Sequence, residues 1–432
     1  MALGGGTWSQ QNKILPGAYI NFVSAGKAGI TLSERGVCAI PMELNWGKDS
    51  AVMEISADDI ANVSCKVFGY EYTDKELAPI REVFRHAKTL YIYRLNSGEK
   101  AANDYATANC SGVRGNDIKI AITANVDEAG KFDVVTYLDT VKVDMQTVEK
   151  AADLKANDYV TFKINSTLET TAAVALTGGT NSEVTGEAHQ KALDALEAYS
   201  FNVLGCPSAD DKVKALYVAY SKRMRDDVGV KFQTVVYDMA ADYIGVINLK
   251  SKVMGGAEQN LIYWLTGAEA GCEINKSVTN MKYDGEYMVD TPLTQYELKV
   301  SVKNGEFVFH AVGSEVHVLE DINSFVTVTS EMGNDFQLNQ VIRILDQVGN
   351  DIASIFNTKY LGKIQNDDSG RISFWNDVVS FFARMQDIGA IENFDSGSVT
   401  VENGGDKRAV LVSTACQPVC AMEKLYMTVA VE

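Results

Sequence analysis

Residues 201–237 read FNVLGCPSADDKVKALYVAYSKRMRDDVGVKFQTVVY, and their pattern sets the class of fold. An apolar run at 201–204 predicts a buried strand, and Ser208 then offers a side chain that can cap a helix. A second strand-like run covers 230–237. Together these features predict a β-α-β unit, and hence a parallel sheet flanked by helices. The apolar residues at helical spacing between the two strands are Val213, Leu216, Tyr217, Tyr220 and Met224.

Similar patterns occur upstream of this unit. Residues 76–87 carry apolar side chains at helical spacing and lead into a strong strand at 89–93. Shorter strand-like runs lie at 36–40 and 66–68, and Thr185 can cap a further helix. We therefore expect helices and strands to alternate on both sides of the middle of the chain.

A different composition separates these two parts. Residues 96–179 are rich in Asn, Thr, Gly and Asp and contain several alternating runs with turn signals between them. Such a pattern is typical of a small all-β unit. The fold class we predict is therefore α/β multidomain. Residues 24–95 and 180–330 form one central α/β sheet domain, and 96–179 are an all-β domain inserted in it.

The next segment, 331–417, predicts a compact C-terminal α+β domain. Apolar residues from 338 to 355 and from 372 to 388 indicate two amphipathic helices, and short strands follow at 398–401 and 409–412. The spacing of the first stripe is also compatible with a coiled coil. It lasts only about three heptads and lacks organised flanking charges, so a core helix is favoured.

Both ends of the chain contain strand-like segments and are expected to be extended arms, at 1–23 and 418–432. In the second arm, apolar residues alternate with others from 425 onward, which is the pattern of a strand. A strand on an arm can pair within its own domain or add to a neighbouring subunit, and the second option would make a polymer. The residues expected to carry this pairing are Tyr19, Ile20, Phe22, Val23, Leu425, Tyr426, Met427 and Val429.

Composition limits the possible functions. The 432 residues are 46% hydrophobic and 22% charged, as expected for a multidomain globular protein. A net charge of −18 disfavours nucleic acid as a partner, because that binding draws on Lys and Arg contacts with phosphates. Seven scattered cysteines without a Cys-x-x-Cys motif favour reduced thiols in a cytoplasm. The start of the chain lacks the features of a signal peptide, and no apolar run predicts membrane insertion.

No catalytic motif stands out, so no enzymatic activity and no cofactor are expected. The phosphate-loop, His-Glu-x-x-His and Gly-x-Ser-x-Gly patterns do not occur. The nearest candidate is Gly178-Gly179, which precedes a predicted helix and could hold an anion. It lacks the lysine of a phosphate loop, and a structural turn is the favoured interpretation.

The histidines and cysteines do not predict a metal site. His310 and His317 flank Gly313-Ser314 and could face each other across a hairpin, but two ligands alone do not define a site. Cys416 and Cys420 are interpreted as free thiols. Separately, the basic residues Lys359, Lys363 and Arg371 form a local cationic cluster, which is either a solvated face or a contact for an acidic partner.

Seven short sequence strings occur along the chain in an order that can be compared with known families. They are GGGT at 4–7, LPGAYINF at 15–22, SGVRGNDI at 111–118, LTGGTN at 176–181, KRMRD at 222–226, VLEDINS at 318–324 and KLYMTV at 424–429. In this order they resemble the contractile tail sheath proteins of Gram-positive myophages, defective prophages and phage-tail-like bacteriocins. Cys416 and Cys420 are not part of that pattern.

The resemblance implies a structural subunit that polymerises as stacked hexameric rings around a tail tube. The sheath would contract and drive the tube through the target cell envelope. The implied partners are other copies of the chain, the tail tube protein, and baseplate and tail terminator proteins. Assembly would occur in the bacterial cytoplasm, before the particle is a virion tail or is released. The terminal arms would add strands to the C-terminal domain of another subunit, and Lys359, Lys363 and Arg371 would contact an acidic tube.

Chain lengths are compatible with exchanged arms. Residues 1–17 can span up to ~56 Å when extended, at ~3.3 Å per residue. A compact chain of this length has a radius of gyration of about 22 Å. Two alternatives stay open at this point: a polymer that does not contract, and an α/β enzyme with a phosphate-binding Gly178-Gly179 loop at the carboxyl edge of its sheet.

Overall fold

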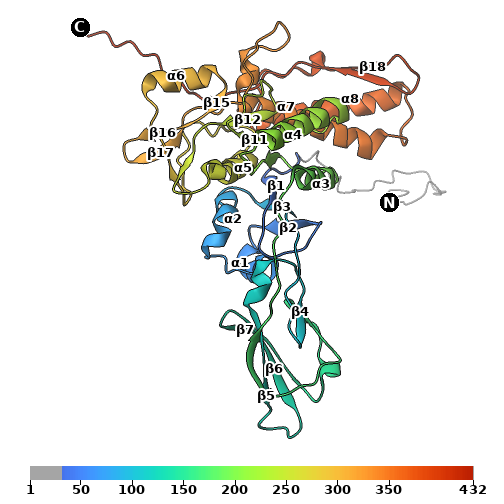
Figure 1. Cartoon of the computed structure of the whole chain (residues 1–432). Coiled ribbons are helices and arrows are strands. Elements are labelled where there is room, and N and C mark those ends of the chain that lie inside the picture. The colour runs from blue at the N-terminus through green and yellow to red at the C-terminus, as the bar shows by residue number, and fades with distance from the viewer. Residues whose placement is uncertain (1–31, 432) are drawn as a thin grey trace, which may run out of the picture.

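A seven-stranded sheet organises the centre of the molecule (Figure 1). The computed structural model describes residues 32–431, and the strand order is β15-β12-β11-β10-β1-β3-β2. Neighbouring strands are parallel, except that β2 is antiparallel to β3. The bounds are β1 (Val37–Met42), β2 (Val52–Ser56), β3 (Thr89–Arg94), β10 (Val203–Gly205), β11 (Gln233–Tyr237), β12 (Val246–Leu249) and β15 (Glu306–Phe307).

Helices cover both faces of this sheet, and its strands are therefore buried on both sides. Cys38 and Ile40 of β1 point to a core shared with α1, α2 and α5, whereas Ala39 between them points to a core shared with α3 and α4. The bounds of these helices are α1 (Ile60–Phe68), α2 (Ala78–Val83), α3 (Gly186–Leu196), α4 (Asp211–Lys222) and α5 (Leu261–Gly271).

The predicted β-α-β unit is present, but one cap was assigned wrongly. The strands β10 and β11 are parallel and α4 connects them. Thr185 caps α3 as predicted. Asp210, rather than Ser208, caps α4, because its carboxylate accepts the backbone N–H groups of Lys212 and Val213. The Ser208 hydroxyl instead accepts the N–H of Asp210.

The strand predicted at 66–68 is also wrong, since these residues are the last turn of α1. Ile60, Ser64 and Phe68 recur at a spacing of four and are buried, which is a helical pattern that the strand-like triplet obscured. Gly69 ends the helix in a left-handed conformation with φ +76°. The helix predicted over 76–87 is shorter, with α2 ending at Val83.

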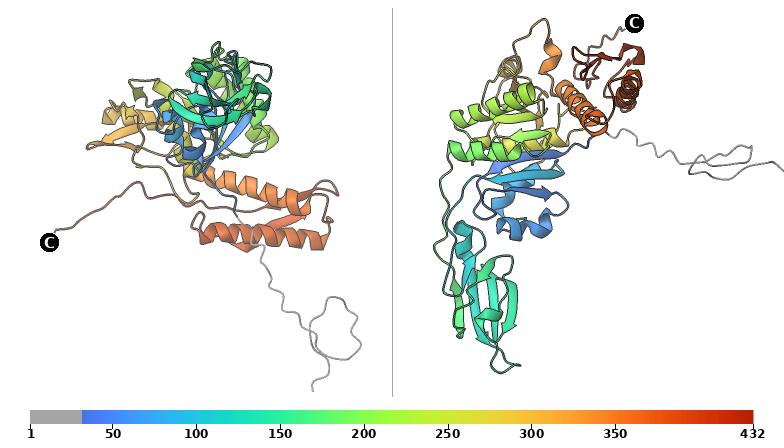
Figure 2. Two further views of the ribbon diagram at one scale, coloured as in Figure 1. Left: turned by 90° about the horizontal axis from the view of Figure 1, so that it is seen from below. Right: turned by 90° about the vertical axis from the view of Figure 1, so that its right-hand side faces the viewer.

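The inserted segment is all β and projects from one end of the central sheet (Figures 1 and 2). It contains a four-stranded antiparallel sheet in the order β7-β6-β5-β9 and a two-stranded sheet of β4 and β8. The short strands β4 and β9 were not predicted. The bounds are β4 (Ala106–Ala108), β5 (Ile118–Ala124), β6 (Phe132–Leu138), β7 (Val141–Val148), β8 (Val160–Phe162) and β9 (Thr171–Ala175).

Two buried arginines fasten this domain to the central one. Arg94, at the end of β3, donates to the carbonyl oxygens of Gly47 and Ser111 at 2.9 and 3.0 Å. Arg114 donates through Nε to the carbonyl of Gly69 at 2.7 Å and through Nη2 to the carboxylate of Asp139 at 2.6 Å. Each guanidinium therefore joins residues of both domains, which fixes their relative orientation.

The C-terminal helices lie side by side, next to the central domain (Figure 2). The apolar face of α7 (Asn339–Ile355) packs on α8 (Asp368–Asp387), which confirms the core-helix interpretation of the first stripe. Ile372, with which the second predicted apolar stretch begins, is not part of the buried face of α8. Ile372 is 61% exposed, whereas Phe374, Phe381 and Met385 are buried. The remaining strands and helix are α6 (Gln295–Lys303), β13 (Val253–Met254), β14 (Met288–Val289), β16 (Phe309–Val312), β17 (Glu315–Val318), β18 (Thr400–Asn403) and β19 (Val410–Ser413).

The predicted fold class is confirmed, because one sheet holds strands from before residue 96 and after residue 202, with the all-β segment between them. The exact domain limits given above stay a prediction. None of the helices within residues 32–431 combines the length and the apolar character that a membrane crossing requires.

We predict that Gly98→Ala destabilises the junction of the inserted domain. A Cβ at residue 98 would lie 1.7 Å from the carbonyl oxygen of Thr180, so the backbone must shift. The expected loss in the free energy of unfolding is about 1–3 kcal/mol, measured by urea denaturation. Gly333→Ala is the matched control, because nothing lies within 4 Å of its added Cβ. Equal stability of the two variants would contradict the prediction.

Candidate inter-subunit surfaces

The C-terminal arm extends away from the body of the molecule (Figure 1). Leu425 is 85% exposed and Tyr426 is 91% exposed, and Met427 and Val429 are also largely exposed. Within residues 32–431, the segment from 422 onward has no strand partner. The predicted strand pairing of this arm is therefore not made inside the described part of its own chain.

The corresponding residues of the N-terminal arm cannot be placed. Tyr19, Ile20, Phe22 and Val23 lie outside the described residues, which begin at 32. Their pairing stays a prediction.

The C-terminal domain contains a small sheet of only two described strands. The strands β18 and β19 pair antiparallel, and no other described strand joins them. Their inner side chains, Val401, Val410 and Val412, are half-buried against the core of α7 and α8. Leu411 on the outer side is 55% exposed. Both edges of this hairpin present main-chain groups to which a further strand could add.

The polar face of α7 binds both the first described segment of the chain and the start of the C-terminal arm. Gln347 donates to the hydroxyl of Ser33 at 2.6 Å, and Asp351 accepts hydrogen bonds from the same serine. About two turns earlier on α7, Gln340 donates to the carbonyl of Val419 at 3.0 Å and accepts the N–H of Ala421 at 3.0 Å. Gln340 and Gln347 are about 10 Å apart along the helix axis. The segment at Ser33 and the start of the C-terminal arm are therefore held at two neighbouring points on one helix.

The first residues after the β18–β19 hairpin are also fixed. Ile391 and Pro418 form an isolated antiparallel bridge. Glu392 donates its N–H to the carbonyl of Gln417 at 3.0 Å, and Val419 donates to that of Ala390 at 2.9 Å. The exposed part of the arm starts directly after this anchored part.

The cationic cluster is only partly available for a partner. Lys359 lies 3.1 Å from the carboxylate of Asp377, and Lys363 donates to the carbonyl of Thr358. The side chain of Arg371 is only 14% exposed and contacts Asp368. The three predicted residues thus lie near one another but have different surroundings.

Arg371 also lines a cavity of about 380 Å³ that the sequence analysis missed. The cavity has an apolar lining that includes Phe356 and Phe374, and Lys407 and Arg408 lie at it together with Arg371. The turn of the β18–β19 hairpin brings this basic pair close to the start of α8. The available sequence signal was the Lys-Arg dipeptide between two predicted strands.

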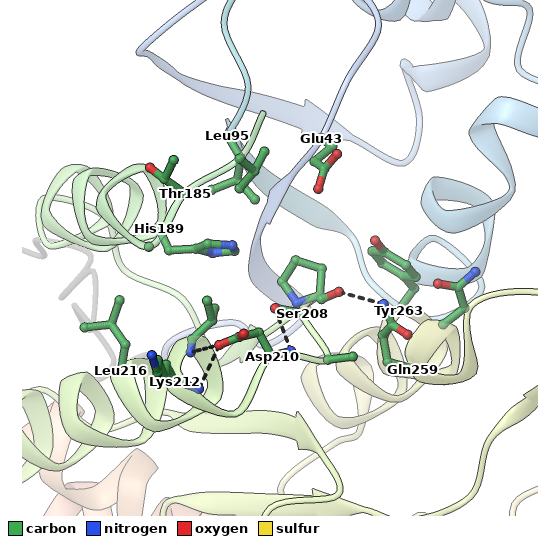
Figure 3. Close-up of a pocket in the computed structure, with 16 residues that line it drawn as sticks. Glu43, Leu95, Thr185, His189, Ser208, Asp210, Lys212, Leu216, Gln259 and Tyr263 are labelled. Atoms are coloured by element: carbon green, nitrogen blue, oxygen red, sulfur yellow. Dashed lines mark hydrogen bonds between the residues drawn. The ribbon is translucent and has the colours of Figure 1, made fainter. Parts of the chain in front are cut away.

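A crevice of about 580 Å³ lies at the carboxyl ends of β1 and β10, where an α/β enzyme would bind its ligand (Figure 3). Several of its polar side chains have structural partners. Asp210 caps α4, and Ser208 accepts the N–H of Asp210. The Nδ1 of His189 lies 2.9 Å from the hydroxyl of Tyr217, and burial lowers the pKa of this histidine to about 4. No nucleophile paired with a base occurs among these lining residues.

The Gly178-Gly179 segment does not line that crevice. The N–H of Gly179 donates to Oδ1 of Asn116 at 2.8 Å, and Nδ2 of Asn116 donates to the carbonyl of Gly179 at 2.9 Å. Gly178 has φ +84°, which favours glycine. The favoured interpretation as a structural turn is confirmed.

The remaining histidine and cysteine interpretations can be compared with the structure. His310 and His317 are direct cross-strand partners in the β16–β17 hairpin, as predicted. Cys416 and Cys420 are both free thiols. In the part of the chain that the structure describes, no three His, Cys, Asp or Glu side chains gather in a way that could hold a metal ion.

Comparison with known proteins gives a consistent family. Four family models match consecutive segments: the domain III N-terminal region of tail sheath protein Gp18 at 35–95, the phage tail sheath protein beta-sandwich domain at 96–181, the phage tail sheath protein central domain at 182–324, and the phage tail sheath C-terminal domain at 331–432.

Individual relatives agree with these matches. The chain is 35% identical to XkdK, a protein of the phage-like element PBSX of Bacillus subtilis (strain 168), over 468 aligned residues that cover 99% of this chain and all of that protein. The solved structure of the sheath tail protein from Desulfitobacterium hafniense is 37% identical and has a TM-score of 0.84. The match covers 95% of this chain and 99% of that one.

The contracted helical sheath of the anti-feeding prophage has a similar fold, with a TM-score of 0.58 at 12% identity over 96% of this chain and 98% of that one. The high coverage at 35–37% identity decides the family, because it extends along all parts of the fold described above. This chain belongs to the phage tail sheath family, whose members are structural proteins rather than enzymes.

Proposed function

We propose that this tail sheath protein polymerises as stacked hexameric rings around a tail tube, and that the polymer contracts to drive the tube through the envelope of a target cell. The observation that supports the proposal is that two elements, the C-terminal arm and the β18–β19 hairpin, each have main-chain groups available for pairing with a further strand. The arm from 422 to 431 is exposed and has no strand partner among residues 32–431, and no strand in that range joins either edge of the β18–β19 hairpin.

Strand addition between subunits would satisfy both surfaces. An arm from one subunit adds to an edge of the β18–β19 hairpin of a neighbour, so that Leu425, Met427 and Val429 face one side of the enlarged sheet. Main-chain hydrogen bonds supply affinity in this mode, and alternate side chains supply specificity. Tyr426 would lie on the opposite side. We assign the same role to Tyr19, Ile20, Phe22 and Val23 of the N-terminal arm.

Anchoring of the arms makes such links mechanically useful. Because Val419 is bonded to α7, a pull on the C-terminal arm acts on this helix, to which Ser33, downstream of the predicted N-terminal arm, is also bonded. Arg94 and Arg114 hold the inserted domain to the central one. A subunit can then move as one body during contraction, while the arms beyond these anchors change direction.

We further propose that the cationic side of the C-terminal domain faces the tail tube. Lys363 is the exposed member of the predicted cluster that makes no ion pair among residues 32–431. Lys407 and Arg408 add positive charge beside it, whereas Arg371 mainly supports the local structure. An acidic tube surface would be attracted to this region of an otherwise acidic protein.

We predict that deleting residues 425–432 leaves a folded chain that does not polymerise, because these residues contribute little to the packing of their own chain. Size-exclusion chromatography should show a monomer, and circular dichroism should show unchanged helix content. Negative-stain microscopy of the full chain should show long cylinders of two lengths and diameters. Cylinders of normal length from the truncated chain would disprove strand exchange by this arm. A single diameter for the full chain would indicate a polymer that does not contract.

We predict that Val429→Pro impairs assembly far more than Val429→Thr does. Proline removes a main-chain donor and cannot extend a ladder, whereas threonine keeps the β-branched shape and the N–H group. The expected result is at least a tenfold rise in the critical concentration for polymerisation, measured by light scattering. If both variants assemble equally, main-chain pairing at this position is not required.

We predict that Lys363→Glu combined with Lys407→Glu releases the tube from the extended sheath without preventing sheath polymerisation. Reversal of two charges replaces attraction to an acidic tube with repulsion. The control is Lys142→Glu, which changes an exposed lysine on the inserted domain. Co-sedimentation of sheath and tube measures the effect, and unchanged co-sedimentation of the double variant would argue against this contact.

A further inference from the structure

The junction between α5 and α7 buries two carboxyl groups and one cation. Arg343 of α7 has no exposed side-chain surface, and neither does Glu269 of α5, while Asp321 is 1% exposed. Arg343 lies 2.6 Å from Glu269 and 3.2 Å from Asp321. These three residues, which we name the junction triad, connect the C-terminal domain to the central domain.

Other charged and titratable groups also face the triad. Arg35 comes from the segment before β1, and its guanidinium donates to the main-chain carbonyls of Glu269 and Cys272 at 2.9 Å each. Burial raises the pKa of the Cys272 thiol to about 11, so it is neutral near pH 7. Asp346, one turn along α7, is bound by both Nη atoms of Arg225.

The two carboxyl groups of the triad share a single contacting cation. Within residues 32–431, Arg343 is the cation that contacts either carboxyl group, while Arg35 contacts main-chain carbonyls there. Two ionised carboxylates at one guanidinium would repel each other where neither side chain reaches solvent, and such an arrangement is costly. One proton on the carboxyl pair removes this repulsion.

Hydrogen bonding at the triad points to the same proton. Oδ2 of Asp321 accepts from Ser277, Val278 and Arg343, but Oδ1 is buried and has no donor among the described residues. Buried acceptors are rarely left unsatisfied. A protonated Glu269 carboxyl group would supply the missing donor to Asp321.

Burial and the nearby Asp321 carboxylate raise the pKa of Glu269 to about 8, even though Arg343 opposes this effect. Burial also acts on Asp321, but the charge of Arg343 and hydrogen bonds from neighbours hold its pKa below the usual range. The proton therefore resides on Glu269, and Asp321 stays ionised.

We propose that docking of the C-terminal domain on the central domain is proton-linked, with one proton held between Glu269 and Asp321. Loss of this proton leaves two buried carboxylates that repel each other at one guanidinium, and loosens α7. This inference concerns the fold of the single subunit and does not depend on the mode of assembly.

The direction of the pH effect follows from linkage. Between the ordinary carboxyl pKa of 4.5 and a folded value of about 8, Glu269 binds a proton in the folded chain but not in the unfolded one. Rising pH in this window therefore favours unfolding, and the contribution is fully present below about 4.5 and lost by about 8. One proton corresponds to about a tenfold change in the folding equilibrium constant per pH unit.

The test compares the unassembled full chain with Glu269→Gln, which mimics the neutral carboxyl group. We expect the folding equilibrium constant of the wild-type chain, relative to that of the variant, to fall as pH rises from about 5 to about 8. The fall should approach tenfold per pH unit, and urea denaturation measures both constants. Asp321→Asn should move the window to lower pH, because it removes the neighbouring negative charge. A constant difference between wild type and Glu269→Gln across this range would overturn the proposal.

A second measurement on the wild-type chain keeps the proposal testable if the variants do not fold. Infrared difference spectra recorded on either side of about pH 8 should show the loss of one protonated carboxyl group. Hydrogen exchange of the α7 amides, corrected for the intrinsic effect of pH, should accelerate over the same interval. Absence of the carboxyl signal, or unchanged protection of α7, would contradict a proton-linked junction.

Discussion

The structure depends on a helix with two buried faces of opposite chemistry. The apolar face of α7 packs on α8, while its polar face carries Arg343, Asp346 and Asp351 into the junction with the central domain. Buried charges destabilise a protein unless each has a partner. The polar face of α7 can therefore pack only against a surface whose partner side chains lie at matching positions. Arg225 meets Asp346 with two parallel hydrogen bonds of 2.6 and 2.7 Å. An apolar junction could slide, whereas this one has a single orientation.

A fixed orientation matters because the segment around Ser33 and the start of the C-terminal arm are held by the same helix. The segment around Ser33 lies at one point of α7 and the segment around Val419 at another, so the two segments keep a constant separation. The β18–β19 hairpin packs on the apolar core that α7 shares with α8. The start of the C-terminal arm and the β18–β19 hairpin therefore belong to one structural unit. A neighbour linked through either of them would be positioned relative to the central domain as well.

Sequence patterns predicted the parts of the fold that rest on apolar periodicity. The β10-α4-β11 unit, the inserted strands β5 to β8 and α7 were visible because their apolar side chains recur at fixed spacing. The strand predicted at 66–68 was wrong because two consecutive apolar residues at the end of a helix, Val67 and Phe68, resemble a short strand. The polar face of α7 escaped notice, since Arg343 and Asp346 look like solvent-exposed residues until their partners, more than twenty positions away, are known. Lys407 and Arg408 were missed for the same reason, as a hairpin turn brings them to the start of α8.

The acidity of the chain bears on how copies of it can associate. Subunits with a net charge of −18 repel one another, although salt screens that repulsion beyond about 8 Å at physiological ionic strength. Main-chain ladders suit this situation because their hydrogen bonds do not depend on the charge of the side chains. The exposed arm from Leu425 to Val431 carries no charged residue, and the inner face of the β18–β19 hairpin is formed by valines. The surfaces proposed for association are thus among the least charged of the protein, which lets short-range contacts outweigh the repulsion between whole subunits.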